Sequence, residues 1–167
     1  MEIPKWQITT VIAPATDTVA ETFVWYRPID RLQIGAALLW KQGAFRGLAN
    51  YQLVKETVSQ PSIRVGFGLQ GIGTGNPGYF ATMEKSLFLK EGGITAYAGV
   101  GFRTNEDHAH GLGGVKFSPA DTPWTLGVQF DGHWAHPFAT YRLKDGWSVG
   151  AYLVESRTPG LMISWAK

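Results

Sequence analysis

Apolar and polar residues alternate along most of the chain with a period of two, which is the period of a β-strand. The pattern is clearest between Ser62 and Arg103, where three runs of about ten residues are separated by turn sequences rich in Gly, Asn and Pro. One face of the first run is apolar, and the other carries glycine together with arginine and glutamine. The two faces of this run are Ile63, Val65, Phe67 and Leu69 on one side and Arg64, Gly66, Gly68 and Gln70 on the other.

The same alternation, interrupted by turn signals, predicts about twelve strands, or ten if the first two or the last two runs are misread. Asp131-Gly132 and Asp145-Gly146 are typical of two-residue hairpin turns with positive φ. Thr158-Pro159-Gly160 is predicted to turn the chain into the last strand. The strongest helical candidate, Ala81 to Leu89, lies between strand-like neighbours and is predicted as a strand. A chain of 167 residues suits a single domain covering residues 1–167.

The composition of the glycine-bearing face helps to distinguish a soluble sheet from a membrane-embedded one. A soluble barrel or a sandwich solvates a face rich in Lys, Glu and Asp, whereas a membrane barrel turns apolar residues to lipid and small or polar residues to its lumen. Runs of about ten residues also suit a tilted bilayer crossing, and open edges cannot exist in hydrocarbon. The sequence therefore predicts a closed antiparallel up-and-down transmembrane β-barrel with short turns at both ends; a soluble closed barrel and a sandwich remain alternatives.

Aromatic residues concentrate near the ends of the predicted strands, as in the two interfacial girdles of a membrane barrel. The alternative is that they are simply buried in a soluble core. The residues assigned to the girdles are Trp6, Trp25, Tyr26, Trp40, Phe45, Tyr79, Phe80, Phe102, Phe117, Trp124, Trp134, Trp147 and Trp165.

Composition limits the partners. The net charge of +2 gives no electrostatic case for nucleic acid, and the absence of cysteine excludes disulfides and thiolate metal sites. The first ten residues have no basic region followed by an apolar one, so the chain is predicted to be a mature form without a signal peptide, located in the bacterial outer membrane. The expected partners are a lipid bilayer or detergent and a small solute or ion in the lumen; a monomer is favoured.

Charged and amide side chains on the glycine-bearing face are the candidates for lining a pore. Buried ionisable groups need partners, which predicts pairs of arginine with carboxylate along the interior and a weak preference for anions. The predicted lumen-lining residues are Arg31, Arg46, Arg64, Gln70, Glu84, Arg103, Gln129, Asp131 and Arg142.

Histidines are the candidates for a metal site. His108 and His110 share a face and follow two acidic residues, but such a pair supplies only two of the three or four ligands that a site usually needs. His133 or His136 could join from a neighbouring hairpin. The prediction is nevertheless lumen-facing or interfacial histidines, with no metal and no cofactor.

Motifs for catalysis are weak. No serine lies in a G-x-S-x-G elbow, and a lipid-modifying enzyme would need a triple such as His110, Ser148 and Glu84, which any barrel interior supplies by chance. GIGTGNPG, from Gly71 to Gly78, superficially matches a phosphate-binding loop, but a strand rather than a helix is predicted to follow it. No catalytic residues are predicted.

Two segments carry a family resemblance. PSIRVGFGLQGIGTGNPGYFATMEKSL and the later VQFDG with HPFATYRLKDGWSVGAYL resemble short YjbH-like outer-membrane barrel proteins, which have a strand ending GLQDIG, a strand with ASKSL, and an EYDG hairpin pair. The likeness covers about two-thirds of the chain; only Lys85-Ser86 of ASKSL is kept, and Gln129 replaces a frequent acidic residue. It implies an outer-membrane β-barrel with envelope or exopolysaccharide associations and no transferable catalytic residues.

Three functions follow from these observations. The leading hypothesis is a small, porin-like outer-membrane barrel with a structural or passive pore role. The alternatives are a soluble lipocalin-like barrel that binds an apolar ligand, and an outer-membrane lipid-modifying enzyme. In the lipocalin-like barrel, Ile63, Val65 and Phe67 would line the cavity; in the membrane barrel they would face outward.

Overall fold

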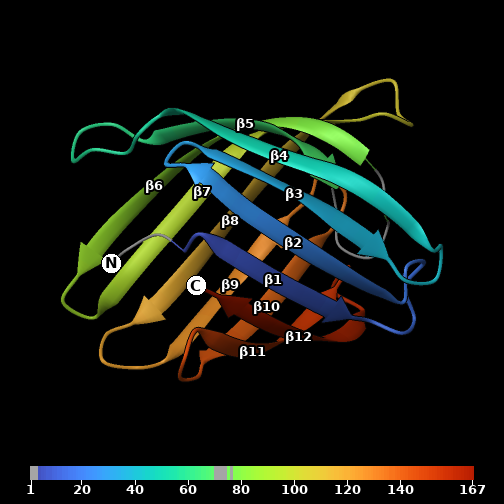
Figure 1. The fold of residues 1–167 in the computed structure, drawn as a ribbon. Coiled ribbons are helices and arrows are strands. Elements are labelled where there is room, and N and C mark those ends of the chain that lie inside the picture. The colour runs from blue at the N-terminus through green and yellow to red at the C-terminus, as the bar shows by residue number, and fades with distance from the viewer. Residues whose placement is uncertain (1–3, 70–74, 76) are drawn as a thin grey trace.

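The computed structural model describes residues 4–69, 75 and 77–167, in which every regular element is a strand (Figure 1). Twelve strands close into one antiparallel barrel, each pairing with its neighbours in sequence and the last with the first. The predicted closed up-and-down barrel of about twelve strands is confirmed. The described residues contain no helix long and apolar enough to span a membrane. The strands are β1 (Trp6–Ile12), β2 (Ala20–Ile29), β3 (Leu32–Leu39), β4 (Ala44–Val54), β5 (Ser62–Leu69), β6 (Pro77–Leu89), β7 (Gly92–Arg103), β8 (Ala109–Pro119), β9 (Trp124–Phe130), β10 (Ala135–Arg142), β11 (Trp147–Val154) and β12 (Thr158–Ala166).

The barrel has two unlike ends. One end, which we call the terminal rim, carries both ends of the chain: the Trp6 N–H donates to Lys167 O at 2.7 Å, and the Lys167 N–H donates to Trp6 O at 2.9 Å. The opposite end, which we call the histidine rim, carries the connection from β7 to β8 and the connection from β9 to β10. The connections at the terminal rim are residues 30–31, 55–61, 90–91, 120–123 and 143–146; those at the histidine rim include 13–19, 40–43, 104–108, 131–134 and 155–157.

The outer face is an almost unbroken apolar belt. Directly paired residues of antiparallel strands share a face, so the register assigns side chains to the outside in lateral rows. Phe67, for example, pairs with Tyr79, which pairs with Phe102. The large apolar side chains exposed along these rows are Trp6, Ile8, Ile12, Ile34, Phe45, Tyr51, Leu53, Phe67, Tyr79, Met83, Leu87, Leu89, Val100, Phe102, Val115, Trp124, Leu126, Phe130, Trp147, Val149, Leu153, Leu161 and Ile163.

Aromatic side chains gather in this belt toward both rims. Toward the terminal rim the ring centroids of Trp6 and Tyr26 lie 4.5 Å apart, and Trp147 pairs with Trp165 across β11 and β12. Toward the histidine rim Phe45, Phe67, Tyr79, Phe102 and Phe130 take the corresponding positions.

Two predicted girdle residues lie on the inner face instead. Trp25 pairs with Gly35, and Phe80 pairs with Gly66. A Cβ added to Gly66 would lie 2.7 Å from Phe80 Cζ, so the ring lies directly over the glycine. Placing Trp25 and Phe80 in the girdles was therefore wrong: an aromatic ring can pack across the bare backbone of a neighbouring strand inside the barrel, and strand-end position alone does not reveal this.

The same packing recurs on the other side of the barrel. A Cβ on Gly114 would lie 2.5 Å from Tyr97 Cε1, and one on Gly127 would lie 2.5 Å from Phe138 Cζ. Phe138 in turn stacks on Tyr152 with ring centroids 5.3 Å apart. The inward glycines therefore let aromatic rings pack directly over the backbone of a neighbouring strand, and they also leave space inside the barrel.

Turn chemistry follows the sequence in one of three places. Asp145 and Gly146 both have positive φ, 56° and 81°, as predicted for a primed hairpin turn. The last strand begins at Thr158, so residues 158–160 belong to β12 and the turn prediction there is wrong. The turn is formed by Glu155 and Ser156, with φ of 54° and 55°, although neither is glycine.

Asp131-Gly132 is not a primed two-residue turn, because only Gly132 has positive φ, 100°. The Asp131 carboxylate instead accepts hydrogen bonds from the backbone N–H groups of His133 at 3.0 Å and Trp134 at 2.8 Å. An aspartate that accepts from the backbone two residues on forms an Asx-type turn. This side chain is buried in the network described below.

Candidate lumen site

The middle of the lumen is lined by polar side chains beside a small cavity of about 130 Å³. Glu84 of β6, Lys116 of β8 and Gln129 of β9 contribute to its wall, together with the Tyr97 ring. The Glu84 carboxylate lies 3.9 Å from the Arg64 guanidinium, with both side chains partly exposed. One of the arginine–carboxylate pairs expected from the sequence therefore crosses from β5 to β6.

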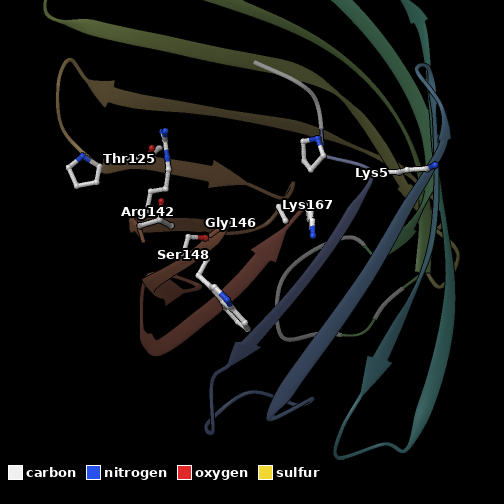
Figure 2. A pocket seen from close by; sticks show the side chains of 11 residues that line it. Lys5, Thr125, Arg142, Gly146, Ser148 and Lys167 are labelled. Atoms are coloured by element: carbon white, nitrogen blue, oxygen red, sulfur yellow. The ribbon is translucent and has the colours of Figure 1, made fainter. Parts of the chain in front are cut away.

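A larger cavity of about 600 Å³ opens near the terminal rim (Figure 2). It lies against the last four strands and the start of the chain. Its wall carries the cationic side chains of Lys5, Arg142 and Lys167, and the hydroxyl groups of Thr125 and Ser148. The same wall also includes the apolar residues Pro4, Pro123 and Trp147, so cationic and hydroxyl groups stand beside apolar surface.

A second cationic group lies on the inner wall of β2 to β5. Arg27 and Arg64 line one recess with the side chains of Gln33 and Asn50. The Nε atoms of Arg27 and Arg46 are buried, and among the described residues they have no hydrogen-bond partner. Unsatisfied guanidinium N–H groups beside a polar lumen can donate to an anion or to water.

The inner wall at the histidine rim is filled by packed side chains. Polar groups are buried there beside apolar ones, and the largest fully buried side chains include Leu39, His136, Glu21 and Val154. The Cβ position of Gly75 is 2.8 Å from Leu39 Cδ1 and 3.3 Å from Thr18 Cγ2, so part of the connection from β5 to β6 packs here too. The buried apolar residues of the described chain are Val11, Ala13, Ala20, Ala37, Leu39, Leu48, Val154 and Met162.

Arg103 and Asp131 form the central ion pair of this end. Arg103 Nη2 lies 3.1 Å from Asp131 Oδ2, and Arg103 Nη1 lies 3.4 Å from Glu106 Oε1. Arg103 also donates to the Asp131 backbone carbonyl at 3.3 Å. Arg103 and Asp131 are both buried, so each charge depends on the other for compensation.

His136 completes the network. Its Nδ1 accepts from the Glu155 backbone N–H at 3.1 Å, which places the ring proton on Nε2, 3.3 Å from Asp131 Oδ2. Burial alone would raise the pKa of the Asp131 carboxyl. His136 and the backbone N–H groups of Trp134 and His133 outweigh burial and hold that pKa well below its usual range.

The predicted lumen-lining residues are spread along the barrel rather than gathered in one site. Arg46, Arg64, Glu84 and Gln129 lie on the inner face of strands, as their alternation predicts. The remaining ones lie at the rims. Arg31 is exposed on connection 30–31 and lines the recess of Arg27 and Arg64, and Arg142 is exposed at the end of β10 and lines the large cavity. Arg103 and Asp131 are buried at the histidine rim, and Gln70 lies outside the described residues.

Sequence reasoning missed several cationic side chains of the lumen. Arg27 and Lys116 share the inner parity of β2 and β8, a signal that was available in the alternation. Lys5 and Lys167 reach the large cavity because the two chain ends pair with each other. That pairing results from closure of the barrel and leaves no signal in the local sequence.

The hypothetical catalytic triple is not assembled. His110 is the second residue of β8, at the histidine rim, whereas Ser148 is the second residue of β11, at the terminal rim, and Glu84 lies in the middle of β6. The residues therefore lie at different levels of the barrel, and none of the described residues that line the cavity of Ser148 is a histidine.

Fold and lumen together define a class: a closed β-barrel that turns an apolar, aromatic-edged face outward and a glycine- and arginine-bearing face inward. No family model matches the sequence, and no curated protein is significantly similar to it.

Proposed function

We propose that the protein is a small bacterial outer-membrane β-barrel with a structural or narrow passive pore role. The observation that carries this proposal is the outer belt, in which side chains such as Phe67, Met83 and Leu161 are about half exposed or more. A monomeric soluble protein rarely exposes contiguous apolar surface on this scale. Burial in lipid removes that surface from water, and a closed barrel leaves no unpaired backbone within the bilayer.

The lumen supports a passive role. Its polar side chains, which lie beside interior rings such as Phe80 and Phe138, carry more guanidinium and ammonium groups than free carboxylates, and this charge balance favours small anions weakly. The side chains packed against the inner wall at the histidine rim narrow the lumen, so any ion conductance through the barrel is expected to be small. We assign no chemistry to the lumen, because the polar groups are distributed rather than convergent.

The lipocalin-like alternative requires the opposite orientation of the strands. Ile63, Val65 and Phe67 share outer rows with the exposed Met83 and Tyr79, while Arg64 lines an inner recess. A soluble binder with this orientation would leave its apolar face in water and its polar face around the ligand, which is unfavourable on both counts.

Membrane insertion is tested with a matched pair of variants on β9. Leu126 faces outward and Gln129 lines the lumen cavity. Leu126→Arg should oppose insertion, at a cost of up to about 2–4 kcal/mol near the bilayer centre, whereas Gln129→Arg should insert like the wild type. The measurement is the fraction of refolded protein that floats with vesicles. A wild-type chain that stays monodisperse in detergent-free buffer would refute the proposal.

Conductance separates the two roles. Folded wild-type barrels in a planar bilayer are expected to give small, weakly anion-selective steps if the lumen is continuous. Vesicle insertion without any conductance would assign the structural role. Neither result would be obtained from a soluble barrel, which would not insert.

A further inference from the structure

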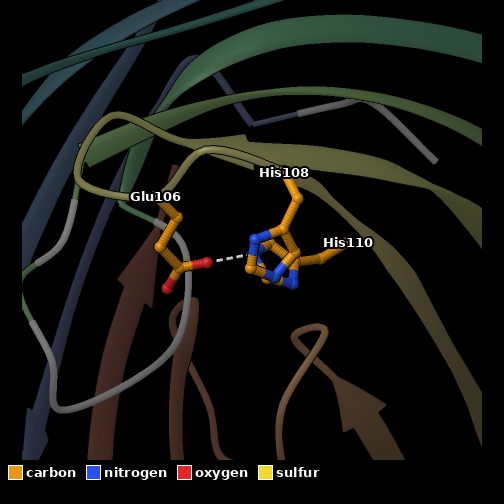
Figure 3. A group of neighbouring side chains, drawn as sticks. All are labelled: Glu106, His108 and His110. Atoms are coloured by element: carbon orange, nitrogen blue, oxygen red, sulfur yellow. Dashed lines mark hydrogen bonds and ion pairs between the residues drawn. The ribbon is translucent and has the colours of Figure 1, made fainter.

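Three histidines and a glutamate converge at the histidine rim, outside the lumen site described above. Glu106 and His108 lie on the connection from β7 to β8, and His110 follows at the start of β8. One ligand atom from each of these residues lies within 4.8 Å of the others (Figure 3). His133, on the connection from β9 to β10, places its Nε2 3.3 Å from the Glu106 carboxylate.

The rings are packed together rather than scattered. The ring centroid of His110 lies 4.6 Å from that of His108 and 4.3 Å from that of His133. His110 Nε2 also contacts Glu106 Oε2 directly. The sequence pattern offered the His108–His110 pair after two acidic residues and left His133 or His136 as possible additions; the fold brings Glu106 and His133 to the pair.

The fourth side chain is brought in by backbone packing. A Cβ on Gly132 would lie 2.4 Å from the Cβ of His110, so the β9–β10 connection rests directly on that histidine. The next residue is His133, whose backbone N–H is held by the Asp131 carboxylate. Gly132 therefore permits the approach, and Asp131 fixes the turn that presents the ring.

We propose that Glu106, His108, His110 and His133 bind a divalent transition-metal ion of the zinc type. Imidazole nitrogen and carboxylate oxygen are ligands that zinc takes in four-coordinate sites. His110 Nε2 and His133 Nε2 both meet the Glu106 carboxylate; a divalent cation that displaces the ring protons there would be held by the same nitrogen and oxygen atoms and would neutralise the carboxylate charge. Binding would tie the β7–β8 connection to the β9–β10 connection.

Groups around the four residues fit this role. Asp107 Oδ1 lies 2.9 Å from His108 Nδ1, which leaves His108 Nε2 free to coordinate; carboxylates commonly orient metal-binding histidines in this way. Arg103 Nη1 lies 3.4 Å from Glu106 Oε1 and fixes the other side of the carboxylate. The His108 and His133 side chains are 64% and 36% exposed, whereas that of His110 is 5% exposed, so an ion can enter from solvent and reach a buried ligand.

The test uses the folded full-length chain in detergent, purified without a histidine tag. Titration with ZnCl₂ should give one equivalent bound per chain in calorimetry, and CoCl₂ should give the visible absorption of four-coordinate cobalt. His133→Gln removes a partly exposed ligand and should weaken affinity at least tenfold. Asp107→Asn, which removes only the orienting carboxylate, should weaken it about 10- to 100-fold.

Glu91→Gln, on the opposite rim, is the matched control and should bind like the wild type. Circular dichroism and the gel mobility of unheated samples verify that each variant is folded. The proposal is overturned if the folded wild type shows neither zinc uptake in calorimetry nor the absorption of four-coordinate cobalt. It is equally overturned if folded His133→Gln and Asp107→Asn bind as tightly as the wild type, or if Glu91→Gln loses the ion to the same extent.

Discussion

Asp131→Asn is expected to destabilise the folded barrel by about 3 kcal/mol. The asparagine oxygen can still accept from the backbone N–H groups of His133 and Trp134. Its amide group, however, would face Arg103 and the Nε2–H of His136, which are both donors. Removing one partner of a buried ion pair costs about 3–5 kcal/mol, and the lower end applies because Glu106 stays 3.4 Å from Arg103.

The assay is urea unfolding in detergent micelles, followed by tryptophan fluorescence and by gel mobility. Asp145→Asn is the control: Asp145 is exposed on connection 143–146, and asparagine tolerates its positive φ of 56°. The control should lie within about 0.5 kcal/mol of the wild type. Adding Arg103→Met to Asp131→Asn should restore part of the loss, because no cation is then left buried alone. A loss below about 1 kcal/mol for Asp131→Asn would refute the central role of this ion pair.

Three further predictions concern other parts of the barrel. The folded-state pKa of the Asp131 carboxyl is depressed, so the carboxylate contributes its full share to the free energy of unfolding above its ordinary pKa of about 3.9, and this share is lost as the pH falls below that value. Urea midpoints measured from pH 7 to pH 2 should therefore fall more steeply for the wild type than for Asp131→Asn. Parallel curves for the two proteins would contradict this. Gly114→Ala should cost about 1–3 kcal/mol because the Tyr97 ring must move, whereas Gly111→Ala on the same strand meets no atom within 4 Å and should be nearly neutral in the same unfolding assay. If the lumen conducts, Arg64→Gln should lower the anion-to-cation permeability ratio a few-fold, since a unit charge at about 7 Å in water contributes about 0.6 kcal/mol; the reversal potential in a salt gradient measures this, with Lys41→Gln, on an exposed connection, as the unaffected control.

Much of the barrel could be predicted because strand alternation is a local property. The inner positions of Arg64, Glu84 and Gln129 follow directly from the period of two. The ends of the strands were harder to predict from the sequence. Glu155 and Ser156 form a turn without glycine, while Pro159 and Gly160 lie inside β12. Here pairing with β11 outweighs the local turn preference of Pro and Gly.

The contacts between hairpins could not be predicted from the sequence. The approach of His133 to Glu106 depends on how the β9–β10 connection packs against His110 at Gly132, and the two residues are 27 positions apart in the sequence. Trp25 and Phe80 were misassigned for a related reason. Whether an aromatic ring faces lipid or covers a glycine depends on the residue paired with it across the sheet, which the period within one strand does not contain.

The pairing of β1 with β12 has a consequence for the order of events during biogenesis. Thr9 and Ser164, whose hydroxyl groups lie 2.8 Å apart across this seam, are separated by 155 positions. One edge of β1 therefore stays unpaired until β12 is available, and an unpaired strand edge is prone to intermolecular pairing. Closure between β1 and β12 is therefore expected to be the last pairing step of folding, because it removes this exposed edge.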